Sequence, residues 1–143
     1  MAMMELMKAV YPVEAADYTS AGSASADIKR RLKKLGITGD VLRRVAVASY
    51  EVELNLVIHS LGGELDLVVY PEYVQLVSSD RGPGIPDLSL AMREGWSTAN
   101  DEARSLGFGA GMGLPNMKRN ADEFDIQSTV GVGTNITMRF RLA

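Results

Sequence analysis

The sequence predicts an α+β fold, a two-layer sandwich in which helices pack on one face of a mixed, mostly antiparallel sheet. Apolar residues recur at helical spacing in two segments of the first half of the chain. Later segments alternate apolar and polar residues and come in two pairs joined by short turns, which is typical of antiparallel hairpins. Antiparallel strands with helices on one face make such a sandwich. With 143 residues, the chain is expected to form one domain, residues 1–143.

The composition indicates an ordinary globular protein. The formal net charge is -3, which gives no electrostatic reason to expect nucleic acid as a partner. The sequence contains no cysteine, so disulfides, thiolate metal sites and a Cys nucleophile are excluded. It shows neither a signal-peptide pattern nor an apolar run approaching the roughly 20 residues of a membrane span. We therefore expect a soluble cytoplasmic protein with no membrane partner.

The N-terminal part of the chain is predicted to form one strand and one helix. Residues 5–11 have the composition of a short strand, and residues 12–23 that of a loop. Over residues 24–35 an apolar stripe recurs at helical spacing, made by Ile28, Leu32 and Leu35. Gly36 is the expected residue at the end of this helix.

A longer helix is predicted over residues 41–60. Thr38 and Asp40 are both candidates for its N-cap, because their side-chain oxygens can accept a backbone N–H. Gly62 and Gly63 end it. Its apolar face is made by Leu42, Val45, Ala46, Val52 and Leu56.

Two hairpins and two further helices are predicted in the rest of the chain. A short helix spans residues 87–95. After a polar, Gly-rich stretch, residues 112–123 form a helix whose Pro115 fits only in the first turn. The strands of the two hairpins span residues 64–70, 73–79, 124–128 and 135–142.

Three polar side chains share one face of the long helix, because Glu51, Asn55 and His59 follow one another at four-residue spacing. A carboxylate one turn from a carboxamide makes a plausible site for water or for a hard cation such as Mg²⁺. Taken alone, a solvated helix face is the simpler interpretation.

The stretch DRGPGIPD follows a predicted strand. Gly82 and Gly84 permit positive φ and close approach of the backbone to a ligand. Asp80 can accept a hydrogen bond from an exocyclic amine such as that of adenine. An ordinary β-turn is the alternative, since Asp, Gly and Pro are all common in turns.

Two further Gly-rich segments come later. GFGAGMGL leads into a helix, where exposed backbone N–H groups and the helix dipole can hold an anion. Its glycines are Gly107, Gly109, Gly111 and Gly113. A flexible hinge is the alternative. VGVGT, ending at Thr134, lies between the last two strands and by itself indicates only a Gly-rich hairpin.

Together and in this order, the four features resemble the GHKL family of ATPases. ExxxN on a helix is followed by DxGxG after a strand, by a Gly-rich loop before a helix and by GT in the last hairpin. The resemblance covers roughly residues 25–142. The family includes histidine kinases, type II topoisomerases, a heat-shock chaperone, mismatch-repair ATPases and small serine kinases that act as anti-sigma factors.

Within the family, the chain is most similar to the stand-alone anti-sigma serine/threonine kinases and stressosome switch kinases. In a chain of 143 residues, we expect neither a transducer domain nor a dimerisation domain beside this one. Its one histidine, His59, lies inside the ExxxN helix and is not the phosphoacceptor of a histidine kinase. A role as a partner of Asn55 or Glu51 is one interpretation of His59, and we favour a structural role at the helix end. Ile58 stands where histidine kinases commonly have a basic residue. Residues 91–124 are especially similar to the switch-kinase type.

The resemblance implies a site for ATP or ADP. Asp80 would accept from the adenine amino group, Thr134 would support that end of the base, and Gly82 and Gly84 would lie against the purine. Asn55 would ligate Mg²⁺. The four glycines Gly107, Gly109, Gly111 and Gly113 would wrap the phosphates through their backbone N–H groups. Residues 88–106 would form the ATP lid, with Arg93 and Arg104 as candidates to meet the γ-phosphate.

It also implies a reaction and partners. Glu51 would be the general base or would orient the attacking hydroxyl, so that the γ-phosphate passes to Ser or Thr of a STAS-domain antagonist of an anti-sigma factor. The alternative is a catalytically weak module that binds ATP or ADP and sequesters a sigma factor or activates a phosphatase. Homodimers are frequent in the family.

Overall fold

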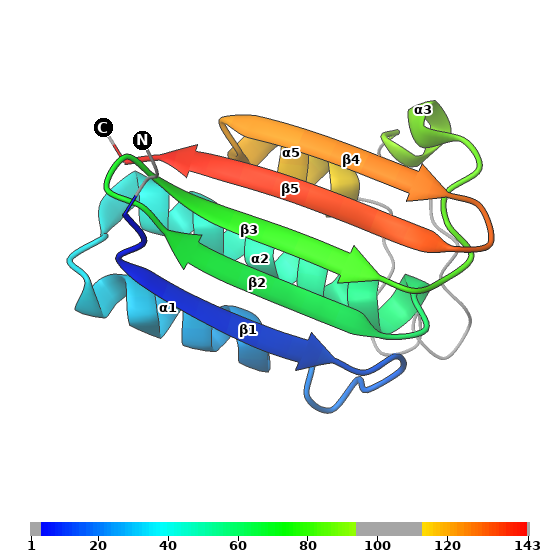
Figure 1. Ribbon diagram of the computed structural model, residues 1–143, viewed down its shortest axis with the longest axis horizontal. Helices are drawn as coiled ribbons and strands as arrows, with labels where there is room; N and C mark the ends of the chain where they lie inside the picture. The colour runs from blue at the N-terminus through cyan, green and yellow to red at the C-terminus, as the bar shows by residue number, and fades with distance from the viewer. Residues whose placement is uncertain (1–3, 94–112, 143) are drawn as a thin grey trace.

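A computed structural model describes residues 4–93 and 113–142 (Figure 1). The predicted α+β fold is confirmed. In chain order, the elements are β1 (Met7–Val13), α1 (Ser23–Lys34), α2 (Gly39–His59), β2 (Gly63–Val69), β3 (Tyr73–Asp80), α3 (Leu88–Ala91), α5 (Gly113–Asn120), β4 (Glu123–Thr129) and β5 (Gly133–Arg141).

The five described strands form one sheet in the order β1-β2-β3-β5-β4. Both predicted hairpins are present, as β2–β3 and β4–β5, and all four pairings between described strands are antiparallel. β3 pairs with β5, so the end of β3 at Asp80 lies beside the start of β5 at Gly133 (Figure 1). This neighbour relation brings the DxGxG stretch next to the last hairpin.

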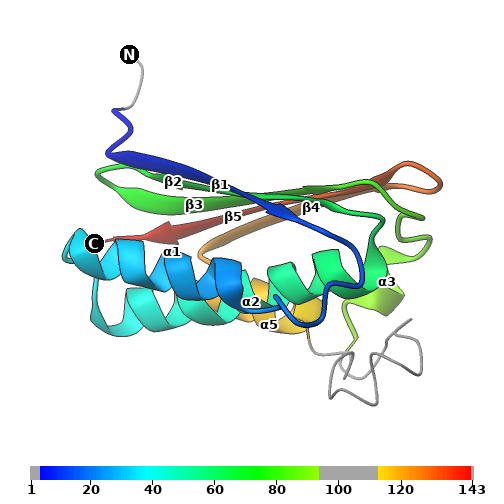
Figure 2. The same cartoon turned by 90° about the horizontal axis from the view of Figure 1, so that it is seen from below.

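The helices α1, α2 and α5 lie on one side of the sheet, as Figure 2 shows. Alternate side chains of the strands point toward them. Those of β2, β3 and β5 are buried together with the apolar stripes of the helices, whereas those of the edge strands β1 and β4 are half-buried. The core includes Ile28, Leu32, Val45, Val52, Leu65, Leu76, Met138 and Phe140. Of the apolar face predicted for the long helix, Leu42, Val45, Val52 and Leu56 belong to this core, whereas Ala46 is half-buried and lies outside it.

The helix ends follow local chemistry. Gly36 has φ +82°, its N–H binds Lys33 O, and Ile37 N–H binds Leu32 O, which is a Schellman motif. The prediction that Gly36 ends the first helix is therefore confirmed. Thr38 occupies the N-cap of α2, without a hydrogen bond from its side chain.

Several predicted boundaries are wrong by a few residues. β1 begins and ends two residues later than predicted and includes Pro12, which its position at the sheet edge tolerates. The helix predicted over residues 112–123 ends at Asn120, because Asp122 N–H binds Arg139 O and the chain enters β4. Within residues 4–93 and 113–142, no helix is long and apolar enough to cross a bilayer.

Candidate functional site

Glu51 and Asn55 lie one turn apart on α2, and the start of α5 lies against both. A Cβ added to Gly113, the first residue of α5, would lie 3.2 Å from Asn55 Oδ1 and 3.3 Å from Glu51 Oε2. Glu51 Oε1 also accepts a hydrogen bond from Asn116 Nδ2 at 3.2 Å. Both α2 side chains are half-buried. The pair is therefore enclosed by α5 and is not an open solvated face.

His59 is the last residue of α2 and follows Asn55 by one further turn. Burial lowers the pKa of His59, which favours the neutral imidazole. Its proposed structural role at the helix end stays a prediction.

Asp80 ends β3 and is held by the neighbouring strand. Its Oδ1 accepts the backbone N–H of Thr134 at 3.0 Å. Burial raises the pKa of Asp80, and the hydrogen bond from Thr134 opposes that rise. Oδ2 receives no hydrogen bond from the part of the chain that the structure describes. A partly desolvated carboxylate with a spare acceptor oxygen is suited to a ligand that donates a hydrogen bond.

The two glycines after Asp80 occupy tight positions for different reasons. Gly84 has φ +75°, and a Cβ there would lie 2.5 Å from Thr129 O. Gly82 is buried, and its added Cβ would lie 3.3 Å from Ser60 Cα. Gly84 uses the positive φ that glycine permits, whereas Gly82 does not and is constrained instead by its contact with the end of α2. The loop thus runs close to both α2 and the last hairpin.

Ser128 is a polar residue of this region that the sequence did not single out. Its hydroxyl lies 2.9 Å from Thr134 Oγ1 and accepts the N–H of Ile85 at 2.7 Å. Ser128 faces Thr134 in the β4–β5 register. This pairing was the available signal, because GT in the last hairpin places a second polar side chain directly across from the threonine.

Part of the predicted site lies outside the described residues. Gly107, Gly109, Gly111 and Arg104 are among them, as is most of the predicted lid over 88–106. Of the described part, α3 begins after Asp87, whose side chain accepts Leu90 N–H at 3.0 Å.

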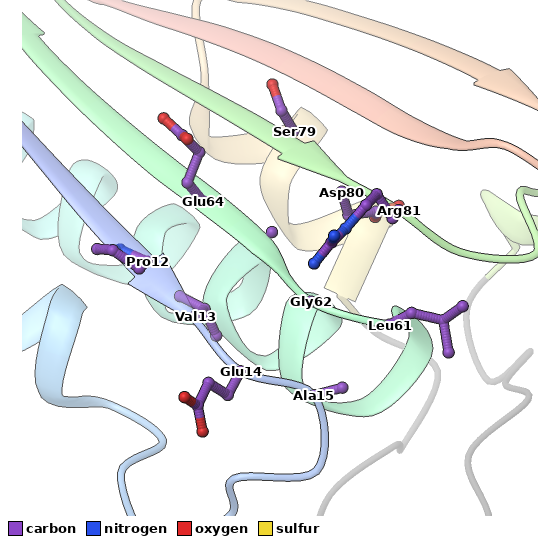
Figure 3. Close-up of a pocket in the computed structure, with 11 residues that line it drawn as sticks. Pro12, Val13, Glu14, Ala15, Leu61, Gly62, Glu64, Ser79, Asp80 and Arg81 are labelled. Carbon is purple, nitrogen blue, oxygen red and sulfur yellow. The ribbon is translucent and has the colours of Figure 1, made fainter.

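A cavity of about 510 Å³ lies beside the site, between the end of β1, the α2–β2 turn and the end of β3 (Figure 3). Asp80 forms part of its wall, but neither Glu51 nor Asn55 lines it. Glu14, Glu64 and Arg81 also line it. With Asp80, three carboxylates outnumber the one guanidinium, so this cavity does not suit the phosphates of a nucleotide.

The described residues fit an adenine nucleotide with Mg²⁺. Asp80 offers a spare acceptor for an amino group, and Asn55 offers a carboxamide oxygen near the start of α5. Residues 4–93 and 113–142 contain no group of three Asp, Glu or His side chains that could hold a metal by themselves. Mg²⁺ at Asn55 would thus rely on other oxygen ligands, as it commonly does when it binds with substrate phosphates.

This α+β sandwich, with its polar pair on the long helix and its aspartate at the end of β3, defines an ATP-binding domain of the GHKL class. The family model described as "Histidine kinase-, DNA gyrase B-, and HSP90-like ATPase" matches residues 42–143, and the chain belongs to that family. The suspected family is thereby confirmed.

Relatives of known name cover most of the chain. It is 32% identical over 108 residues to the serine/threonine-protein kinase RsbT of Bacillus subtilis (strain 168). This match covers 73% of this chain and 75% of that protein. It is 30% identical over 118 residues to the anti-sigma F factor of Priestia megaterium, and the match covers 78% of this chain and 77% of that protein. It is 27% identical over 110 residues to the anti-sigma F factor of Thermoanaerobacter sp. (strain X514), with 73% of each chain covered.

Proposed function

We propose that this protein is a cytoplasmic serine/threonine protein kinase of the anti-sigma factor or switch-kinase type. It transfers the γ-phosphate of ATP to a Ser or Thr of a STAS-domain regulatory partner. The observation that carries the proposal is the pair Glu51 and Asn55, one turn apart on α2 and both facing the start of α5 at Gly113. Relatives named as a serine/threonine kinase and as anti-sigma factors support it.

The adenine end of the nucleotide is assigned to the end of β3. Asp80 holds the amino group through its spare oxygen, and Thr134, whose N–H fixes the other oxygen, supports the same end of the base. At Gly82 and Gly84 the loop has no side chain, so that the backbone at these two positions can lie against the purine. The close contacts of this loop with α2 and β4 support a fixed wall.

The phosphate end is assigned to the start of α5 and the preceding glycines, Gly107, Gly109, Gly111 and Gly113. Asn55 would ligate Mg²⁺, and the bound cation would neutralise part of the negative charge of the phosphates. Gly113 already lies close to the Asn55 carboxamide, which supports phosphates and cation meeting there.

Glu51 is assigned as the general base. Its carboxylate accepts the proton of the attacking Ser or Thr hydroxyl as the oxygen bonds to the γ-phosphorus. The bond from that phosphorus to the β–γ bridging oxygen breaks, and ADP leaves. Phosphoryl transfer needs mainly alignment and charge neutralisation, so one oriented carboxylate suffices for the hydroxyl.

Labelling with γ-labelled ATP tests the proposal. Wild-type protein is incubated with Mg²⁺-ATP and STAS-domain proteins encoded in the same genome, and label on each partner is counted. We expect the wild type to label one partner, and Glu51→Gln to bind nucleotide normally but to transfer no label. Equal labelling by both proteins would remove Glu51 from the base role.

A different outcome favours the alternative function. If the protein captures a sigma factor or phosphatase in the presence of Mg²⁺-ADP or ATP but labels none of the STAS proteins, a nucleotide-dependent binding switch replaces the kinase. Mass spectrometry of the captured partner shows whether it carries phosphate.

A further inference from the structure

Asn116 lies between a cation and the carboxylate assigned as the base. Its Nδ2 donates to Glu51 Oε1 at 3.2 Å, and its Oδ1 accepts from Arg119 Nη1 at 3.2 Å. A guanidinium only donates hydrogen bonds and an ionised carboxylate only accepts them. The carboxamide can therefore satisfy both neighbours only with its nitrogen toward Glu51.

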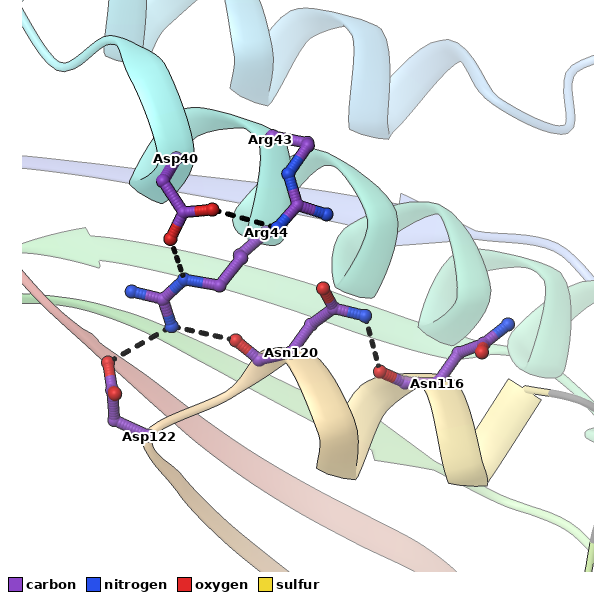
Figure 4. Close-up of polar contacts among 6 residues, drawn as sticks. All are labelled: Asp40, Arg43, Arg44, Asn116, Asn120 and Asp122. Atoms are coloured by element: carbon purple, nitrogen blue, oxygen red, sulfur yellow. Dashed lines mark hydrogen bonds and ion pairs between the residues drawn. The ribbon is translucent and has the colours of Figure 1, made fainter.

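The helix that carries Asn116 is anchored to α2 at its other end (Figure 4). Arg44, two turns before Glu51, donates from Nη1 to the carbonyl oxygen of Asn120 at 2.9 Å and lies 3.2 Å from Asp122 Oδ2. Asn120 in turn donates from its side chain to Asn116 O at 2.8 Å. The Arg44 side chain is 17% exposed, so its contacts are largely shielded from solvent. The contacts of Arg44 fix the position of α5 along α2, whereas the Asn120 side-chain bond lies within α5.

The hydrogen bond from Asn116 distinguishes the two oxygens of Glu51. Oε1 is held by the amide, whereas Oε2 faces Gly113, beside Asn55 Oδ1. Half-buried glutamate has free rotation about its last torsion unless a partner holds it. The bond thus leaves one defined oxygen on the side where the proposed phosphate end and cation lie.

We propose that Asn116 is a positioning residue for Glu51, which holds Oε1 so that Oε2 meets the attacking hydroxyl. The inference rests on the proposed function, because it gives Asn116 a role only if Glu51 acts in phosphotransfer. Asn116 touches neither nucleotide nor acceptor in this role. Its loss lowers turnover and leaves nucleotide affinity unchanged.

Transfer of label from γ-labelled Mg²⁺-ATP to the STAS-domain partner that the wild type labels tests this role, because the attacking hydroxyl belongs to that partner. Asn116→Ala removes the amide, and Asn116→Asp keeps its shape but cannot donate to a carboxylate. We expect both to lower the rate at saturating ATP by about tenfold or more, since small errors in alignment are costly, with half-saturation within about twofold of wild type. The matched control is Asn120→Ala, which removes a side-chain bond one turn further along α5 than Asn116. Its rate is expected to stay within about twofold of wild type.

A double-variant cycle shows whether Asn116 acts through Glu51. In the Glu51→Gln background, Asn116→Ala is expected to cause no further loss, because residues that act as a unit are not additive. A full additional tenfold loss, or no loss from either Asn116 variant in the wild-type background, overturns the positioning role alone. Unchanged turnover in Glu51→Gln instead removes Glu51 from the base role in the proposed function, so the two failures can be told apart.

Discussion

Replacing Glu53 with glutamine is expected to destabilise the fold while leaving the proposed active site chemically intact. The Glu53 side chain comes from α2 and is 2% exposed. Its Oε1 accepts Ser25 N–H at 2.9 Å, and its Oε2 accepts the N–H groups of Gly22 at 3.0 Å and Ala24 at 3.1 Å. The N-cap of α1, Gly22, supplies no side-chain bond. Glu53 therefore caps α1 from another helix.

The size of the effect follows from these three bonds. Glutamine keeps one acceptor oxygen but turns an NH₂ group toward backbone N–H donors. At least one buried donor then loses its partner, at about 1–3 kcal/mol, and the remaining bonds lose their charged acceptor. We expect the free energy of unfolding to fall by about 2–4 kcal/mol. For a domain of this size, the melting temperature then falls by roughly 6–15 °C.

Urea denaturation followed by far-UV circular dichroism measures this loss. Glu51→Gln is the matched control, since it makes the same change two residues earlier on the same helix, where the carboxylate is half-buried and accepts one side-chain bond. We expect the control to change stability by less than about 1 kcal/mol. A loss below about 1 kcal/mol at Glu53, or equal losses at both positions, would refute the capping role.

Two further variants test the loop and the sheet edge. Gly84→Ala forces φ +75° on alanine and places Cβ 2.5 Å from Thr129 O, so thermal melts should show a loss of about 2–4 kcal/mol in the free energy of unfolding. The control Gly36→Ala, at φ +82° with open space around it, should lose only about 1 kcal/mol. Equal losses in the two variants would contradict the clash at Gly84. Tyr11→Phe removes the 2.6 Å bond to Asp27 and should cost about 1–2 kcal/mol at pH 7. Burial and that bond raise the pKa of Tyr11 to about 12, so its contribution is complete below about pH 10 and lost as pH rises through 12. In urea denaturation, the difference in free energy of unfolding between wild type and Tyr11→Phe should be smaller near pH 12 than at pH 7. An equal difference at both pH values would contradict the role of the Tyr11 hydroxyl.

The element order could be predicted because it rests on local periodicity, whereas the ends of elements depend on distant partners. The alternation over 64–70 and 73–79 directly predicts the β2–β3 hairpin. In contrast, the sequence gives no reason for β1 to continue through Pro12. Pairing with Glu64 of β2, a strand far along the chain, sets that end.

In the candidate site, too, some residues could be predicted from the sequence, whereas others depend on contacts between distant parts of the chain. The resemblance to the GHKL family implies that Asp80 and Thr134 lie at the same end of the base, and the structure joins them by a hydrogen bond across 54 positions of the chain. Asn116 was missed because its partner Glu51 is 65 positions away, and no local pattern marks that contact. Glu53 was missed because a glutamate two residues after Glu51 is expected on the far side of the helix, which is where it caps α1.

The central claim is that Asp80 recognises adenine, and calorimetric titration of Mg²⁺-ADP into wild type and Asp80→Asn tests it most directly. Asparagine can still accept Thr134 N–H, but its amide then offers the ligand a donor where the amino group needs an acceptor. We expect Asp80→Asn to lose about 1.5–3 kcal/mol of binding free energy, roughly 10- to 150-fold in affinity. Because burial raises the pKa of Asp80, its ionised form costs the fold stability above that pKa, so the variant should melt no lower than wild type at pH 7. Equal affinity of the two proteins for Mg²⁺-ADP would contradict the claim.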